Sequence, residues 1–139
     1  MTYFFHYMRK TRVSATIPEE ILRRFDEVCK DLGHKNRSSA ISTALYEYIV
    51  SNKWIKKKGN IAGAIIITYD HHTRNINEML TEVQHEYNDI INASLHIHLT
   101  HEQCLEIVAV RGEANKIRKL FKNLQSIKGI FSIKFVASA

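Results

Sequence analysis

The stretch ASLHIHLTHEQCLEIVAVR, residues 93–111, decides how the C-terminal part of this chain folds. Apolar and polar residues alternate from Ala93 to Leu99 and again from Cys104 to Arg111, and a period of two indicates β-strands. A short polar segment separates the two strands, so we expect a hairpin. The hairpin carries two histidines on one strand and a cysteine at the start of the other.

These three side chains predict a metal site. His96 and His98 share one face of their strand, and Cys104 joins them if it lies opposite His98 across the hairpin. Two imidazoles and a thiolate suit nickel, copper or zinc. A His-x-His pair alone is more typical of a hydrogen-bonded surface, and a buried cysteine of inert packing, so the combination at hairpin spacing favours the metal. The other strand face, expected in the core, carries Leu95, Ile97 and Leu99.

The surrounding pattern completes a β-α-β-β-α-β order. Residues 61–69 and 130–136 are expected to form strands, and residues 75–87 and 113–125 helices. This order predicts a ferredoxin-like sheet with two helices on one face, and an open face that packs on another subunit. His85 is a candidate fourth ligand. Its helix is expected on the opposite sheet face, so His85 would reach the metal across a subunit interface.

The N-terminal part has a different pattern. Residues 12–17 alternate as a strand, Pro18 is expected in the first turn of a helix that ends at Gly33, and a second helix is expected after an N-cap at Ser38. About 40 residues of this kind rarely fold alone, so we expect the segment to dimerise.

The charge indicates DNA as the partner of this segment. Residues 1–60 hold 12 of the 20 Lys and Arg residues but only 6 of the 14 Asp and Glu residues, so the whole formal net charge of +6 lies there. Two antiparallel strands from a dimer fit the major groove, and the N-terminus of the second helix would face a phosphate. The residues expected to contact DNA are Arg12, Ser14, Thr16, Asn36, Arg37 and Ser38.

Two sets of motifs resemble a known family. RVSATIPEEIL and GHKNRSSAI (residues 12–22 and 33–41) are similar to ribbon-helix-helix repressors, and QHEYND with SLHIHLTHEQCLEIVAVRGE (84–89 and 94–113) resembles nickel-responsive repressors of the NikR type. The resemblance implies an α+β fold: a ribbon-helix-helix (β-α-α) domain joined to an ACT-type domain.

The same resemblance implies a square-planar nickel site, one ion per subunit. The implied ligands are His96, His98 and Cys104 of one chain and His85 of a neighbouring subunit. Support for the ligands would come from Gln84 and Glu106, and His71 matches a position that the family links to secondary or alternative metal binding.

The expected protein is a homotetrameric repressor, a dimer of dimers, that binds inverted-repeat operators and represses nickel uptake genes when nickel is bound. The expected parts are an arm at 1–11, a DNA-binding domain at 12–52, a linker at 53–60 and a metal-binding and tetramerisation domain at 61–139. Two widely separated cysteines predict a reducing, cytoplasmic protein, and no apolar run reaches the roughly 20 residues that span a bilayer. Ser39 and Thr43 stand where some family members have two acidic residues of an alkali-cation site.

Three alternatives remain at this stage. The chain could be a ribbon-helix-helix antitoxin whose second domain binds a protein, or an ACT-type sensor of a small metabolite, which would leave the histidines and Cys104 without a role. It could also be a zinc hydrolase. A catalytic zinc keeps one open coordination position, and four protein ligands would leave none, so we expect no enzyme.

Overall fold

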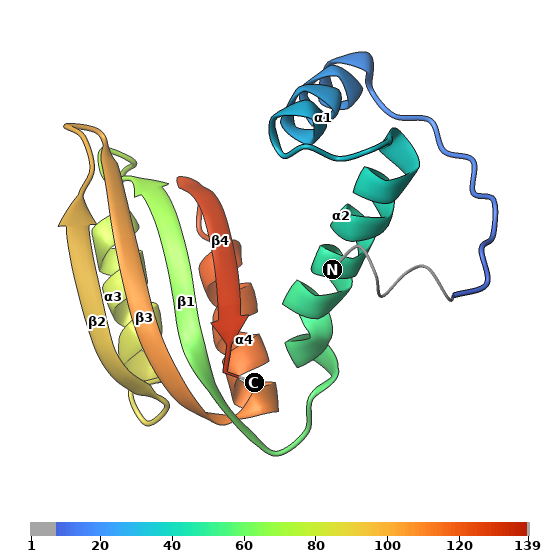
Figure 1. Cartoon of the computed structure of the whole chain (residues 1–139). Helices are drawn as coiled ribbons and strands as arrows, with labels where there is room; N and C mark the ends of the chain where they lie inside the picture. The colour runs from blue at the N-terminus through green and yellow to red at the C-terminus, as the bar shows by residue number, and fades with distance from the viewer. Residues whose placement is uncertain (1–7, 139) are drawn as a thin grey trace. The chain divides into compact units, whose positions relative to one another are not determined.

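The computed structural model describes residues 8–138, and its contacts divide the chain into two compact units, Met1–Val50 and Ser51–Ala139 (Figure 1). None of the described helices is long and apolar enough to cross a membrane.

The N-terminal unit contains helices α1 (Glu19–Asp31) and α2 (Arg37–Asn52). Pro18 is the N-cap of α1, with φ −54° and ψ 134°, and so precedes the first turn in which it was expected. Its carbonyl oxygen still accepts the first helical hydrogen bond, from Leu22 at 3.1 Å. Gly33, with φ +71°, follows the end of the helix as predicted, because glycine adopts this left-handed conformation without steric cost.

The cap of α2 corrects one prediction. The side-chain Oδ1 of Asn36 accepts a hydrogen bond from the backbone N–H of Ser39 at 2.8 Å, and α2 already begins at Arg37. Ser38 therefore lies within the first turn, and its expected role as N-cap is wrong. An asparagine in this position satisfies a backbone donor that the helix itself leaves unpaired.

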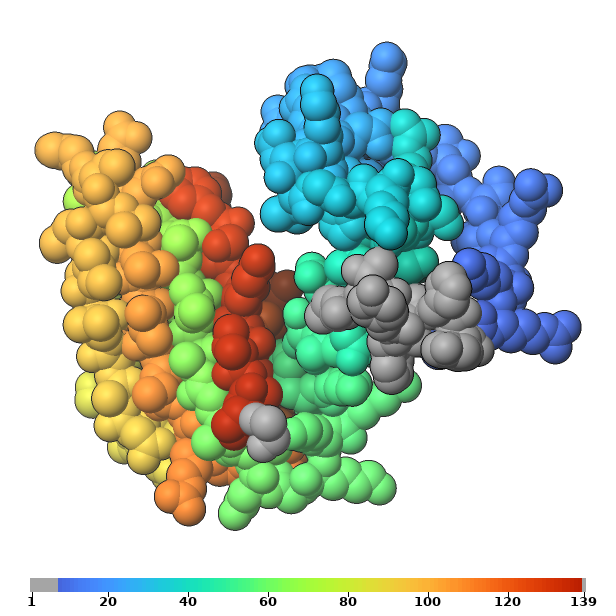
Figure 2. All heavy atoms as spheres, viewed as in Figure 1, coloured from blue at the N-terminus to red at the C-terminus, as the bar shows by residue number. Residues whose placement is uncertain are grey.

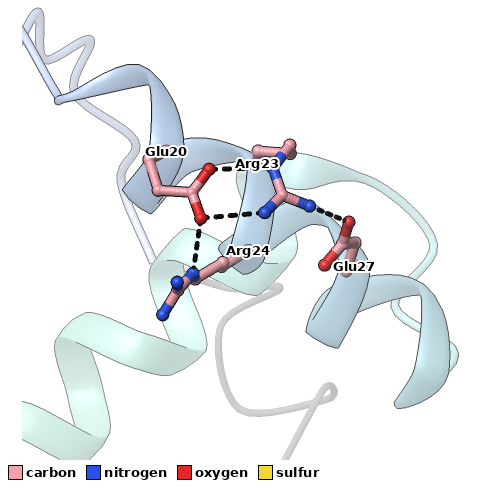
Figure 3. Close-up of polar contacts among 4 residues, drawn as sticks. All are labelled: Glu20, Arg23, Arg24 and Glu27. Atoms are coloured by element: carbon pink, nitrogen blue, oxygen red, sulfur yellow. Dashed lines mark hydrogen bonds and ion pairs between the residues drawn. The ribbon is translucent and has the colours of Figure 1, made fainter.

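An ion-pair network covers the outer surface of α1 (Figure 3). The Glu20 carboxylate accepts hydrogen bonds from Arg23 at 2.8 Å and from Arg24 at 2.7 Å, and these two arginines lower the pKa of Glu20. All of these side chains are more than half exposed, so each pair contributes little to stability. Their spacing of three or four residues supports the helix locally.

The apolar faces of the N-terminal unit remain uncovered within one chain. No residue of α1 is buried, and Ala40 is the one buried residue of α2. Residues 12–17 form no strand, and Val13 is 83% exposed. A ribbon of two strands needs a second copy, so the strand stays a prediction. The exposed apolar residues include Val13, Ile17, Ile21, Val28, Leu32, Ile41, Leu45 and Ile49.

The C-terminal unit confirms the predicted order of elements. It consists of β1 (Asn60–Asp70), α3 (Ile76–Glu86), β2 (Ile91–His98), β3 (Gln103–Glu113), α4 (Ala114–Gln125) and β4 (Ile130–Ala137). The strands form one antiparallel sheet in the order β2-β3-β1-β4. Both helices lie behind this sheet in Figure 1, so one sheet face is covered by helices and the other is open.

The core lies between the sheet and its two helices. On α4, Ile117, Leu120 and Leu124 are buried, and Phe121 packs at the edge of the core. On α3, Ile76 and Leu80 are buried, whereas Met79 is 42% exposed. The main buried side chains are Ile61, Ile65, Ile67, Tyr69, Ile76, Leu80, Cys104, Val108, Val110, Ile117, Leu120, Leu124 and Phe135.

The open face of the sheet corrects a second prediction. Leu95, Ile97 and Leu99 were expected in the core, but they are 55%, 38% and 49% exposed. Alternation separates the two faces of a strand without saying which one is covered, and here the helices cover the histidine face. Figure 2 shows the open face, on which the strands lie as adjoining bands from β2 (yellow) to β4 (red).

Part of the predicted linker is bound to the C-terminal unit. Residues Lys53–Lys56 form a single 3-10 turn, η2, in which Trp54 is only 5% exposed. Its ring packs edge-on against Phe121 and Phe135, with centroids 5.2 and 4.6 Å away. The guanidinium of Arg118 donates to the carbonyl oxygen of Lys57 at 2.9 Å.

Candidate metal centre

The β2–β3 hairpin has the register that the sequence predicted. His98 pairs with Cys104 and His96 with Glu106, and the backbone N–H of Leu99 donates to the carbonyl oxygen of Gln103 at 2.9 Å. Directly paired residues share a sheet face. The two histidines therefore lie on the same face as the fully buried Cys104.

Three potential ligands from three segments meet beside this hairpin. The Sγ atom of Cys104 lies 3.3 Å from Nδ1 of His98 and 3.8 Å from Nδ1 of His71, which follows β1. The ligand atoms of His71, His98 and Cys104 all lie within 4.8 Å of one another. This spacing allows one ion to contact all three after small side-chain movements.

His96 lies next to this cluster. Its ring centroid is 4.8 Å from that of His98, and its Nδ1 atom is 3.1 Å from the hydroxyl oxygen of Tyr69. Tyr69 belongs to β1, pairs directly with Cys104 and is 1% exposed. Sequence reasoning missed this tyrosine, because only the β1–β3 register reveals that it lies beside the hairpin.

Helix α3 covers the histidine face of the sheet, which corrects a third prediction. A cavity of about 420 Å³ is lined by His85 from α3 and by His96 from β2, together with Tyr69 and Glu106. The expectation that this helix lies on the opposite face is wrong. His85 is exposed and is not among the three clustered donors.

A buried carboxylate lies beneath the candidate ligands. Glu106 is 6% exposed, and its Oε1 atom accepts hydrogen bonds from Nε2 of Gln84 at 2.6 Å and from Oγ of Ser94 at 3.2 Å. Helix α3 and strands β2 and β3 are thereby joined next to His96. Gln84 and Glu106, which the resemblance implied as a supporting pair, are in direct contact.

The surroundings of Cys104 and Tyr69 favour the protonated forms of these two side chains in the absence of a cation. Burial, and secondly Glu106, raise the pKa of the Cys104 thiol, although a hydrogen bond to Tyr69 opposes this shift. Burial also raises the pKa of Tyr69 to about 12, with Glu106 adding to the effect. Because a thiol must lose its proton to become a ligand, metal binding here would release that proton.

The residues expected to contact DNA lie on the extended segment before α1 and at the start of α2. Arg12, Ser14 and Thr16 are all exposed on the extended segment before α1. The guanidinium of Arg37 donates to the Asp26 carboxylate at 2.9 Å, so its charge is paired within the unit. Asn36 is occupied as the cap of α2, and Ser38 is exposed.

The C-terminal unit matches a known protein family. Residues 62–138 match the family model of the NikR C-terminal nickel-binding domain. The chain belongs to the NikR family. A relative from Methanocaldococcus jannaschii, named "putative nickel-responsive regulator", is 44% identical over 124 residues, which is 88% of each chain. A second relative, from Methanothermobacter thermautotrophicus, is named "putative nickel-responsive regulator 2". It is 37% identical over 129 residues, which is 92% of each chain.

A solved structure has a similar fold over part of this chain. An uncharacterised protein from Thermotoga maritima aligns with a TM-score of 0.52 and 15% identity, over 58% of this chain and 99% of that one. Imidazoles and a thiolate within reach of one ion are the donors that suit nickel. The donors of the cluster therefore fit the ion for which the NikR domain is named.

Proposed function

We propose that this chain is a nickel-responsive regulator that binds DNA and represses nickel uptake genes when nickel is bound. The observation that carries the proposal is the hairpin register, which brings His98 and Cys104 together with His96 alongside. The relatives named as nickel-responsive regulators support the same function. A reducing cytoplasm would keep Cys104 available as a ligand.

The proposed site holds one nickel per subunit. As the resemblance to the NikR family implies, His96, His98 and Cys104 come from one chain and the exposed His85 from a neighbouring subunit of a homotetramer, while Gln84 and Glu106 fix the position of the hairpin. Nickel bound in this way would supply a bridge between two chains. His71 is an alternative donor, since its Nδ1 atom lies within 4 Å of the Cys104 sulfur.

The DNA-binding half of the proposal concerns two copies of residues 12–52. Strand pairing between copies would cover Val13 and Ile17, which a single chain leaves exposed, and would present Arg12, Ser14 and Thr16 to the major groove. Asn36, Arg37 and Ser38 would lie near a phosphate. A two-fold symmetric dimer requires an inverted-repeat operator.

Nickel titration of the purified protein, followed by absorption, tests the ligand set. We expect thiolate charge-transfer bands of low-spin square-planar nickel that saturate at one ion per chain. Cys104→Ala and His85→Ala should lose these bands, whereas the matched controls Cys29→Ala and His34→Ala should keep them. Loss in His71→Ala but not in His85→Ala would replace His85 by His71 in the site.

Mixing two variants tests whether His85 comes from another subunit. His85→Ala and Cys104→Ala chains, unfolded and refolded together, can form an intact site only if the ligands belong to different chains. Recovery of the bands in the mixture, with none in either variant alone, supports the intersubunit site. No recovery, when refolded wild-type chains bind normally, contradicts it.

Selection from a random pool of double-stranded DNA tests the regulatory half. We expect an inverted repeat to be recovered with nickel and to bind much more weakly after nickel is removed by a chelator. Equal recovery without nickel would indicate a ribbon-helix-helix regulator with a different effector. No recovery under either condition would contradict the DNA-binding proposal.

A further inference from the structure

The side chain of Tyr69 lies beside two candidate ligands that belong to different strands. Its hydroxyl oxygen lies 3.1 Å from Nδ1 of His96 on β2. Tyr69 also pairs directly with Cys104 on β3, so the two side chains lie on the same sheet face, and hydrogen bonding to the tyrosine lowers the pKa of the Cys104 thiol. With 1% of its surface exposed, the tyrosine has little contact with water.

The chemistry of the three groups determines where the protons lie when Cys104 is a ligand. A metal-bound cysteine is a thiolate, which can only accept a hydrogen bond, so the single hydroxyl proton of Tyr69 goes to the sulfur. The tyrosine oxygen keeps lone pairs that accept a second hydrogen bond. His96 then has to donate from Nδ1, and its Nε2 lone pair becomes free for a metal.

We propose that Tyr69 is a positioning residue of the metal centre. Its hydroxyl donates to Sγ of Cys104 and accepts from Nδ1–H of His96, so one buried group orients a ligand on each side. The inference rests on the proposed nickel site and goes beyond it, because it names the tautomer and ligand atom of His96 and a donor to the sulfur.

Two properties of the centre follow from this arrangement. A hydrogen bond to the thiolate withdraws electron density from sulfur, which moves sulfur-to-metal charge transfer to higher energy. A histidine held as the Nδ1–H tautomer is ready to bind through Nε2 without rearrangement. Partners of metal ligands commonly change metal affinity by about 10–100-fold when they are removed.

The variant Tyr69→Phe tests the inference, since it removes the hydroxyl and keeps the ring in the core. We expect nickel to bind about 10–100-fold more weakly, and the thiolate charge-transfer band to move to lower energy. In nickel-loaded wild-type protein, which is diamagnetic if square-planar, the nitrogen-15 spectrum should show a protonated Nδ1 and a metal-bound Nε2 for His96.

The matched control is Tyr87→Phe. Tyr87 is also buried, at 6% exposure, and its hydroxyl accepts from the Asn123 amide at 3.0 Å, away from the hairpin. It should lose a comparable hydrogen bond and leave the band energy unchanged. A general effect of destabilisation would appear in both variants, whereas a shift of the band in Tyr69→Phe alone supports the positioning role.

The failure of this inference is distinguishable from failure of the proposed function. Wild-type protein without nickel charge-transfer bands would overturn the proposed site and the role of Tyr69 with it. If the wild-type bands are present but Tyr69→Phe changes neither their energy nor the affinity, the positioning role is wrong and the site stands. A nickel bond through Nδ1 of His96 would also overturn it.

Discussion

Glu106 is the residue whose burial is hardest to explain without the metal centre. A carboxylate in a protein interior is costly unless it is hydrogen-bonded or paired with a charge. Gln84 and Ser94 satisfy one of its oxygens through neutral donors, and no lysine or arginine within residues 8–138 forms an ion pair with it. A cation bound near His96 would supply the missing opposite charge.

Removing the charge of Glu106 should therefore weaken nickel binding. We expect Glu106→Gln to reduce the affinity by about 10–100-fold, because the amide keeps the shape of the side chain and loses its negative charge. Competition with a chelator of known affinity measures the change. Glu102→Gln, in the exposed turn of the same hairpin, should bind as wild type, and an equal loss there would indicate a general charge effect instead.

Residue types and spacing alone indicated His96, His98 and Cys104 as candidate ligands on the condition that Cys104 lies opposite His98, whereas His71 entered only through the family resemblance. The contacts of Tyr69 and Ser94 could not be predicted in the same way. Tyr69 reaches the hairpin through pairing between β1 and β3, and Ser94 through its bond to a buried carboxylate. The first contact joins strands that are far apart in the sequence, and the second lies diagonally across the β2–β3 hairpin.

Among the elements, the turn η2 connects directly to the core of the C-terminal unit. Trp54 lies between Phe121 of α4 and Phe135 of β4, and Arg118 donates to the carbonyl oxygens of both Trp54 and Lys57. The segment that follows α2 is thus anchored to the sheet domain by aromatic packing and by hydrogen bonds.

Truncating the anchor should destabilise the C-terminal unit. We expect Trp54→Ala to lower the free energy of unfolding by about 3–5 kcal/mol, the usual cost of deleting a large buried aromatic. Urea unfolding at one fixed protein concentration, followed by circular dichroism, measures it. Ile55→Ala, at a neighbouring position that is 48% exposed, should cost less than about 1 kcal/mol. Similar losses in both variants would contradict the anchor.

The order of the elements was predictable, but the sides on which they pack were not. Alternation in 93–111 defined two faces of the hairpin, and the helical pattern of 75–87 defined one apolar stripe. Neither pattern states which face the stripe covers, so His85 and Leu95 were both assigned to the wrong side. The strand at 12–17 depends on a partner chain, and a single chain leaves it unpaired.

At the scale of the whole molecule, each unit leaves an apolar surface exposed. The N-terminal unit exposes residues of both helices, and the C-terminal unit exposes the open face of its sheet. Large contiguous apolar surfaces on a soluble protein usually mark sites of association. Exposed apolar residues on both units agree with the proposed dimer of dimers, in which each set would be covered by a different copy.

A charge on the open sheet face should break one level of this assembly. We expect Leu95→Glu, on a side chain that is 55% exposed in the single chain, to lower the mass measured by sedimentation velocity. Association would bury an unpaired carboxylate at the interface, which makes it less favourable. Met79→Glu replaces a comparably exposed apolar residue of α3 and should leave the mass unchanged. An unaltered mass in Leu95→Glu would show that the sheet face is free.

The register of the hairpin affects how the nickel affinity depends on the concentration of the protein. Pairing between β2 and β3 already closes the short loop between His98 and Cys104. Metal binding therefore does not have to carry the entropic cost of closing this loop. A histidine supplied by a neighbouring chain has no such tether, and its share of the affinity obeys mass action. The cellular abundance of the regulator would then act as a second input to the sensor, alongside the nickel concentration.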